Sequence, residues 1–138
     1  MLVGTFTHSV DEKGRLTLPA KFRDALCHGV VVTRGIDHCL FVYPHTVFET
    51  LAPRITDLPL AEHNVKRHFF ANAANDIPDR QGRVLIPQHL REYAGLKGET
   101  VITGLWDHLE VWHPDRWAAV NAQGDPETLA EHLRQYGI

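Results

Sequence analysis

The 138-residue sequence predicts an α+β protein built from two copies of one small β-rich unit. Residues 11–23 read DEKGRLTLPAKFR and residues 79–91 read DRQGRVLIPQHLR, so five identities recur at a constant offset. The match continues where GIDHCLFVYP at 35–44 corresponds to GLWDHLEVWHP at 104–114. Repetition over this length indicates that a whole unit has been duplicated. In each copy, short apolar stretches of strand length alternate with segments that begin with proline and have helical periodicity.

Each unit opens with the turn sequence D-x-x-G-R. The carboxylates of Asp11 and Asp79 can accept hydrogen bonds from backbone N–H groups that follow them in the chain. Gly14 and Gly82 provide the positive φ angle that other residues resist. These four residues are therefore predicted to shape the turns.

A helix and three short strands complete the core of each unit. The helices, at about 19–27 and 87–95, begin at Pro19 and Pro87, where a missing N–H costs nothing. Gly35 marks a predicted turn between two later strands. Its counterpart is Gly104. The predicted strands are 16–18, 30–33, 40–43, 84–86, 100–103 and 109–112.

Further helices divide the chain. Proline-initiated helices are predicted at 44–51 and 114–120, a linking helix at about 60–71, and a capped amphipathic helix at 125–136. The predicted division is a first unit at 1–52, a linking helix at 53–72, a second unit at 73–120 and a C-terminal helix at 121–138.

The composition is that of a folded chain with a buried core. Hydrophobic residues make up 43% and charged residues 22% of the sequence, which excludes wholesale disorder. No apolar stretch reaches the roughly 20 residues of a membrane span, and the N-terminus lacks the features of a secretory signal. We therefore expect a cytoplasmic protein that does not bind membranes.

The net charge of −3, taken for the whole chain, argues against a nucleic-acid partner. The distribution of that charge along the sequence does not. The windows 11–23 and 79–91 contain seven basic and three acidic residues, a net charge of +4, which leaves −7 for the remainder. Charge segregated in this way is typical of a cationic DNA-facing surface on an acidic body.

The basic side chains of these windows are the candidate DNA-binding residues. Arg15 and Arg83 are predicted to contact bases, because arginine can bond guanine O6 and N7 through two parallel contacts. Lys13 and Arg80 are predicted to position phosphates. Two further arginines on the adjoining helices are either DNA-binding or structural partners of the turn carboxylates: Arg23 and Arg91.

Enzymatic and metal functions find little support. The ten histidines form no recognisable ligand set with each other or with the two cysteines, so no metal or other cofactor is expected. Cys27 or Cys39 activated by a histidine would be a hydrolase nucleophile, but neither has a counterpart in the other unit. We expect no catalysis and no small-molecule substrate. Four aromatic residues in strands are expected in the core or at a subunit interface: Phe41, Tyr43, Trp106 and Trp112.

The paired turns, together with Leu-Thr-Leu-Pro at 16–19, Tyr-Ala-Gly-Leu at 93–96 and Leu-Glu-Val-Trp at 109–112, resemble the MraZ family of bacterial transcriptional regulators. The resemblance covers residues 1 to about 120. It implies two tandem AbrB-like (SpoVT-type) units that interlock into one pseudo-symmetric swapped-hairpin barrel with flanking helices. It also implies a homo-oligomeric ring, associated with the nucleoid, that binds direct repeats of double-stranded DNA in the promoter of the division and cell-wall gene cluster.

One other class of function stays open. The chain could be a scaffold whose rings bind another protein without reading DNA, with the basic turns merely capping the sheet. If DNA is the partner, the ten histidines predict tighter but less selective binding near pH 6 than near pH 8, because their protonation makes the body less negative.

Overall fold

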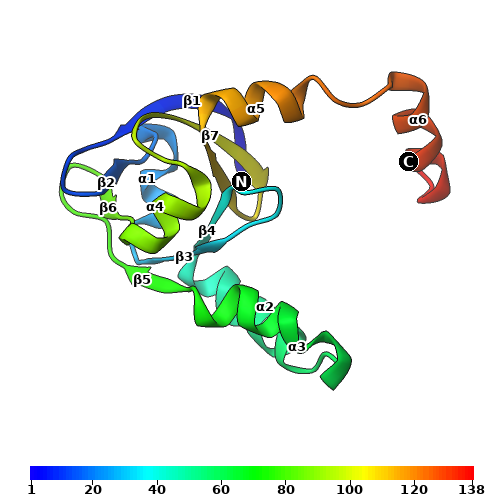
Figure 1. Ribbon diagram of the computed structural model, residues 1–138, viewed down its shortest axis with the longest axis horizontal. Coiled ribbons are helices and arrows are strands. Elements are labelled where there is room, and N and C mark those ends of the chain that lie inside the picture. The colour runs from blue at the N-terminus through cyan, green and yellow to red at the C-terminus, as the bar shows by residue number, and fades with distance from the viewer.

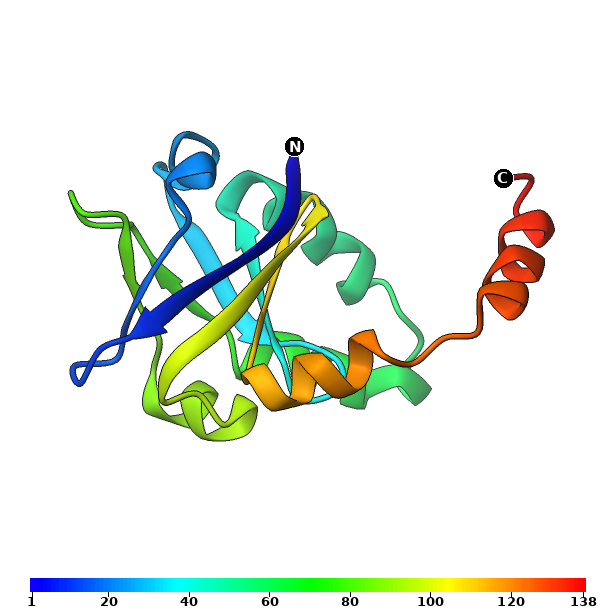
Figure 2. The ribbon, with the colours of Figure 1, turned by 90° about the horizontal axis from the view of Figure 1, so that it is seen from above.

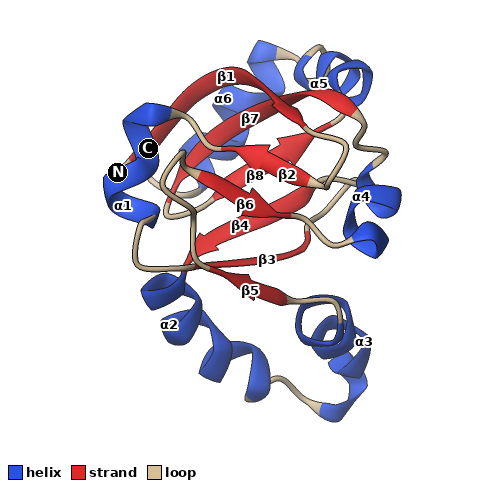
Figure 3. Cartoon of the chain, turned by 90° about the vertical axis from the view of Figure 1, so that its left-hand side faces the viewer, coloured by secondary structure: helices blue, strands red, loops and turns tan.

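The computed structural model describes residues 1–138 and contains one antiparallel sheet of eight strands, curled into a nearly closed barrel (Figure 3). The order across the sheet is β5-β3-β4-β8-β7-β1-β2-β6. The strands are β1 (Leu2–Val10), β2 (Arg15–Thr17), β3 (Val30–Arg34), β4 (Leu40–Pro44), β5 (Ala74–Asp76), β6 (Arg83–Leu85), β7 (Gly98–Trp106) and β8 (Leu109–Trp112).

The two units are interlocked and not side by side. β1 of the first unit pairs with β7 of the second, and β5 of the second pairs with β3 of the first. The equivalent strands β2 and β6 pair with each other through Leu16 and Val84, and β4 pairs with β8. These pairings obey an approximate twofold axis, and the expected α+β class with a pseudo-symmetric swapped-hairpin barrel is confirmed.

Helices surround the barrel and extend away from it (Figures 1 and 3). The α2 and α3 helices project together from the β3–β5 side, whereas α6 stands apart from the barrel beyond α5. No helix has the length and apolar character that would allow it to cross a bilayer. The helical segments are η1 (Ala20–Phe22), α1 (Arg23–Leu26), α2 (His45–Thr56), η2 (Leu60–Glu62), α3 (His63–Lys66), η3 (Arg67–Ala71), α4 (Gln88–Ala94), α5 (Pro114–Asn121) and α6 (Pro126–Gln135).

The β4 strand separates two apolar clusters. Leu40 and Val42 belong to the main core inside the barrel, together with Phe22 of η1 and Leu90 of α4. The alternate residues Phe41 and Tyr43 belong to a second cluster on the outer face, under α2 and α5. Both faces of β4 are covered, which explains why its sequence is apolar throughout instead of alternating.

The seam between β5 and β6 closes the barrel through a side chain. The Asp76 carboxylate accepts a hydrogen bond of 2.7 Å from the backbone N–H of Leu85. At the equivalent place in the other unit, β1 and β2 are joined by a backbone pairing of Val10 with Leu16. The strands on either side of the first turn are thus paired through their backbones, whereas those on either side of the second turn are joined through a side chain.

Several expected elements differ from those observed. The first helix is only a 3₁₀ turn and one α-helical turn over 20–26, and Pro19 and Pro87 lie one residue before their helices. The predicted helix 44–51 was too short, because α2 continues through Pro53 to Thr56. The buried side chain of Ile55 anchors that last turn.

Gly104 is not in a turn, contrary to the prediction. It lies within β7 opposite Gly4, and a Cβ on Gly104 would be 2.5 Å from the carbonyl carbon of Leu2. The glycine is needed for close strand approach, and the chain reverses later, between Trp106 and Leu109. Trp106 is 64% exposed and is therefore not a core residue, whereas Phe41, Tyr43 and Trp112 are buried.

Candidate nucleic-acid interface

The first D-x-x-G-R turn connects β1 to β2 and is organised around the carboxylate of Asp11. Its Oδ1 accepts hydrogen bonds from the backbone N–H groups of Lys13 and Arg15, both at 2.9 Å. Its Oδ2 accepts from the side-chain Nε of Arg15, also at 2.9 Å. Gly14 has a φ of 84°, which a residue with a Cβ adopts only with strain.

The second turn, between β5 and β6, repeats this geometry. Asp79 accepts from the backbone N–H groups of Gln81 at 3.0 Å and Arg83 at 2.9 Å, and from Nε of Arg83 at 2.9 Å. Gly82 has a φ of 73°. In both turns the aspartate thus accepts three hydrogen bonds, and the glycine has a positive φ.

The hydrogen bonds lower the pKa of both turn carboxylates. The backbone N–H of Arg15 lowers the pKa of Asp11, and that of Arg83 lowers the pKa of Asp79, because each bond favours the ionised carboxylate. Both aspartates therefore stay charged at neutral pH.

Arg15 and Arg83 are each held on one side only. Their side chains are 33% and 27% exposed, and only Nε is bonded within the chain. The outer edge of each guanidinium, with Nη1 and Nη2, makes no intramolecular hydrogen bond. A guanidinium fixed in this way can still present two parallel N–H donors to an acceptor pair.

Arg23 and Arg91 do not bind the turn carboxylates, contrary to one of the expected roles. Each guanidinium lies against the glycine of the turn in the other unit: a Cβ on Gly14 would be 3.0 Å from Cζ of Arg91, and one on Gly82 would be 3.0 Å from Cζ of Arg23. The carboxylates are already occupied by the arginines of their own turns. Local spacing could not reveal this exchange, because it depends on the pairing of β2 with β6.

Both turns lie at the same end of the molecule, seen on the left in Figures 1 and 2. The α6 helix lies at the opposite end in both views. Residues 99–138 carry seven acidic and two basic residues. The acidic residues Glu127 and Glu131 of α6 are therefore far from the turns, whereas Glu99 pairs with Ser9 beside the first turn.

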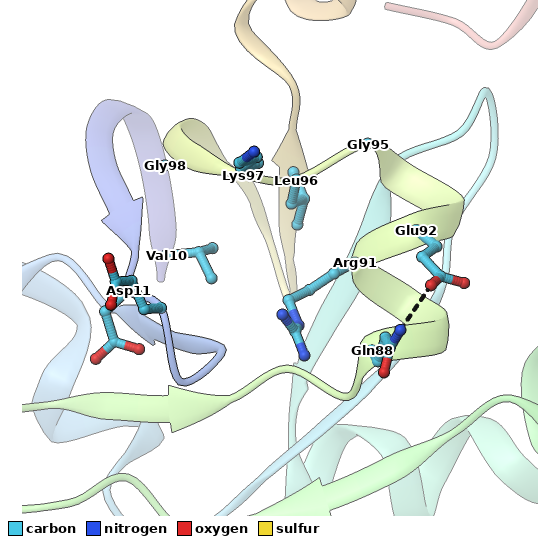
Figure 4. A pocket seen from close by; sticks show the side chains of 10 residues that line it. Val10, Asp11, Gln88, Arg91, Glu92, Gly95, Leu96, Lys97 and Gly98 are labelled. Carbon is cyan, nitrogen blue, oxygen red and sulfur yellow. Dashed lines mark hydrogen bonds between the residues drawn. The ribbon is translucent and has the colours of Figure 1, made fainter.

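A groove of about 800 Å³ lies between the first turn and α4 (Figure 4). Its lining carries three carboxylates and two cations, and the side chain of Arg91 enters it from α4 toward the turn. It contains no histidine or cysteine that could act as a nucleophile or base. The residues that line it are Val10, Asp11, Glu12, Gln88, Arg91, Glu92, Gly95, Leu96, Lys97 and Gly98.

The cysteines and histidines form no cluster that could hold a metal ion. Burial raises the pKa of the Cys39 thiol to about 12, and Cys27 donates its S–H to the carbonyl of Asp24. His68 is bonded through Nε2 to the carbonyl of Gly35. No three side chains among His, Cys, Asp and Glu gather in a geometry that could hold a metal ion.

A family model described as "MraZ protein, putative antitoxin-like" matches the chain twice, at residues 1–68 and 69–135. The chain belongs to the MraZ family. The MraZ relatives include "Transcriptional regulator MraZ" of Roseiflexus castenholzii, 49% identical over 123 residues that cover 87% of this chain and 86% of the relative. The protein of the same name from Herpetosiphon aurantiacus is 42% identical over the full length of both chains.

Membership of the MraZ family confirms the resemblance drawn from the paired turns. Its curated relatives are named as transcriptional regulators, a role that points away from catalysis. The two MraZ matches also divide the chain near the middle, in keeping with a duplicated unit.

Proposed function

We propose that the chain is a sequence-specific transcriptional regulator that binds direct repeats of double-stranded DNA in the promoter of the division and cell-wall gene cluster. The observation that carries this proposal is the doubled turn, in which an aspartate fixes an arginine through Nε and leaves its outer edge free. Such an edge matches guanine O6 and N7 in the major groove. As a DNA-bound regulator, the protein acts in the cytoplasm at the nucleoid.

The side chains of each turn have different roles in binding DNA. Arg15 and Arg83 contact bases, while Lys13 and Arg80, which make no side-chain hydrogen bond within the chain, position phosphates. Asp11 and Asp79 orient the arginines without facing the phosphates themselves. The two reading units are residues 1–52 and 73–120, joined by the linking segment 53–72 and followed by the C-terminal helix, 121–138.

The subunits form a homo-oligomeric ring, with the turns of neighbouring subunits on one face. A single turn offers few contacts, so one subunit binds weakly. Several turns on consecutive repeats raise the effective local concentration and thus the affinity. Comparable affinities for a multi-repeat operator and for a single repeat would contradict this multivalent mechanism.

The proposal is tested with Arg15→Ala and Arg83→Ala, measured by fluorescence anisotropy on a labelled multi-repeat promoter fragment. Loss of one bidentate base contact, worth about 1–3 kcal/mol, weakens operator binding while the thermal transition is preserved. Arg54→Ala is the matched control, because Arg54 is an exposed arginine on α2, away from the turns. Unchanged binding in both turn variants would show that the site lies elsewhere.

A scaffold that binds another protein is the alternative function. Phosphate contacts release counterions and give a steep negative dependence of affinity on salt. A flat salt dependence, or no retardation of promoter DNA at low salt, would favour the scaffold.

Histidine protonation supplies a second readout for DNA binding. We expect tighter and less selective binding near pH 6 than near pH 8 at constant salt. His8 contributes least, because burial, with the nearby Arg23, lowers its pKa. A flat pH profile would contradict this part of the proposal.

A further inference from the structure

The two helix arginines are exchanged between the units. Arg91 follows β6 of the second unit but packs on Gly14 of the first turn, and Arg23 of the first unit packs on Gly82 of the second turn. Because both contacts obey the same approximate twofold axis, they are a property of the architecture and not of one loop.

A chain of hydrogen bonds connects Arg91 to the first turn. Its Nε donates to the carbonyl of Ile86 at 2.9 Å, and the N–H of Ile86 donates to the carbonyl of Gly14 at 2.8 Å. The matching backbone bond, from Leu18 N–H to the Gly82 carbonyl, is 2.9 Å long. Each turn is therefore fixed from the opposite unit by one backbone bond and by packing of a guanidinium on its glycine. Only Arg91 is itself held by a hydrogen bond through Nε, because Nε of Arg23 is buried without a hydrogen-bond partner.

The two turn glycines leave the space that this packing needs. A methyl group on Gly14 would lie 3.1 Å from Nε and 3.2 Å from Nη2 of Arg91. The turn thus has the planar guanidinium against its inner side, while Arg15, one residue later, extends from it toward solvent. Movement of Arg91 changes the support of the loop that carries Arg15.

We infer that Arg91 and Arg23 are positioning residues that act across the barrel: Arg91 orients the Arg15 turn, and Arg23 orients the Arg83 turn. The effect of these residues on DNA binding rests on the proposed function. Their effect on the structure of the turns does not, and it can be measured without DNA. Specificity at each turn then depends on a residue 60 or 76 positions away in the sequence.

The structural readout is amide hydrogen exchange in the absence of DNA. Arg91→Met speeds exchange of the Lys13, Gly14 and Arg15 amides by about tenfold or more and leaves the second turn unchanged. Arg23→Met has the converse effect, on residues 81–83. Gln88→Ala is the control on the same helix, since the Gln88 side chain bonds only Glu92. Equal acceleration in both turns, or acceleration in the turn of the same unit, would overturn the inference.

The DNA readout is a double-mutant cycle on the operator. Arg91→Met weakens binding by about tenfold in the wild-type background, within the roughly 5- to 150-fold range of one base contact. In the Arg15→Ala background it has less than about twofold effect, because the residue that it positions is gone. An equal loss of operator affinity in both backgrounds would mean that Arg91 contacts DNA directly.

Arg91→Lys separates position from charge. Lysine keeps the positive charge but lacks the planar group and the Nε–H of arginine, so it fails to restore either operator affinity or slow exchange of the first turn. Full restoration would reduce the role of Arg91 to electrostatics. If wild-type protein does not bind the operator at all, the proposed function fails, whereas the crossed exchange pattern still decides the positioning role.

Discussion

Arg83 meets both oxygens of the Asp79 carboxylate, through its backbone N–H to Oδ1 and through its side-chain Nε to Oδ2, each at 2.9 Å. Arg15 and Asp11 form the same pair of bonds in the other unit. In each turn one aspartate therefore both closes the loop and orients the arginine. The stability of the loop and the orientation of the guanidinium thus depend on the same carboxylate.

Acid should weaken the turns through these aspartates. Their folded-state pKa values are lowered from the ordinary 3.8, so the stabilisation is complete above that value and is lost as pH falls through the folded-state pKa. We expect the stability difference between wild type and Asp79→Asn to be constant above about pH 5 and to shrink toward pH 3. Urea unfolding over this range measures it, and a difference that grows on acidification would contradict the assignment.

Gly82→Ala should destabilise the protein more than Gly98→Ala does. Both glycines have nearly the same positive φ, 73° and 72°, so both variants carry the cost of about 1–2 kcal/mol of an alanine with positive φ. Only at Gly82 does the new methyl group displace Arg23, whereas nothing lies within 4 Å at Gly98. We expect the overpacking to add about 1 kcal/mol or more in urea unfolding. Equal losses would show that Arg23 moves aside freely.

Phosphate and base contacts should respond differently to salt and sequence. Arg80→Ala should weaken binding to all DNA sequences alike and reduce the slope of log affinity against log salt by about 1. Arg83→Ala should instead relax discrimination between operator and mutated repeats. Titrations on both DNAs at several salt concentrations measure the two effects, and exchanged phenotypes would reverse the assigned roles.

The two thiols should differ sharply in reactivity. Cys39 is buried and its pKa is raised to about 12, so its thiol stays protonated and poorly reactive at pH 8. We expect Ellman's reagent to modify one thiol per folded chain, Cys27, and two after denaturation. Rapid modification of both in the folded protein would show that the outer cluster around Cys39 opens readily.

Sequence alone was sufficient for the parts of the fold that are encoded locally. The duplicated turn, the β4 and β8 strands and the buried helix residues Phe22 and Leu90 follow from short-range patterns. The β1 strand was not predicted, because Gly4 and His8 interrupt the inward-facing series that Leu2, Phe6 and Val10 would otherwise make visible. Its pairing with β7 becomes evident only in three dimensions.

In the candidate site, too, contacts between residues close in sequence were predictable, whereas contacts between the units were not. Asp11 with Arg15 and Asp79 with Arg83 are four residues apart, so their interaction could be predicted from spacing. The contacts of Arg91 with Gly14 and of Arg23 with Gly82 join residues of different units. They depend on strand exchange, which no local pattern contains, and this is why the sequence suggested the wrong partners for the helix arginines.

The two turns of the near-twofold barrel are unequal, since Glu12 of the first turn corresponds to Arg80 in the second. A homodimer of one unit would present identical turns and match an inverted repeat, because operator symmetry mirrors protein symmetry. Fusion of both units into one polypeptide removes that constraint and allows the two halves to diverge. In the proposed DNA complex the chain has a direction along the duplex, which suits a target whose repeats all have the same orientation.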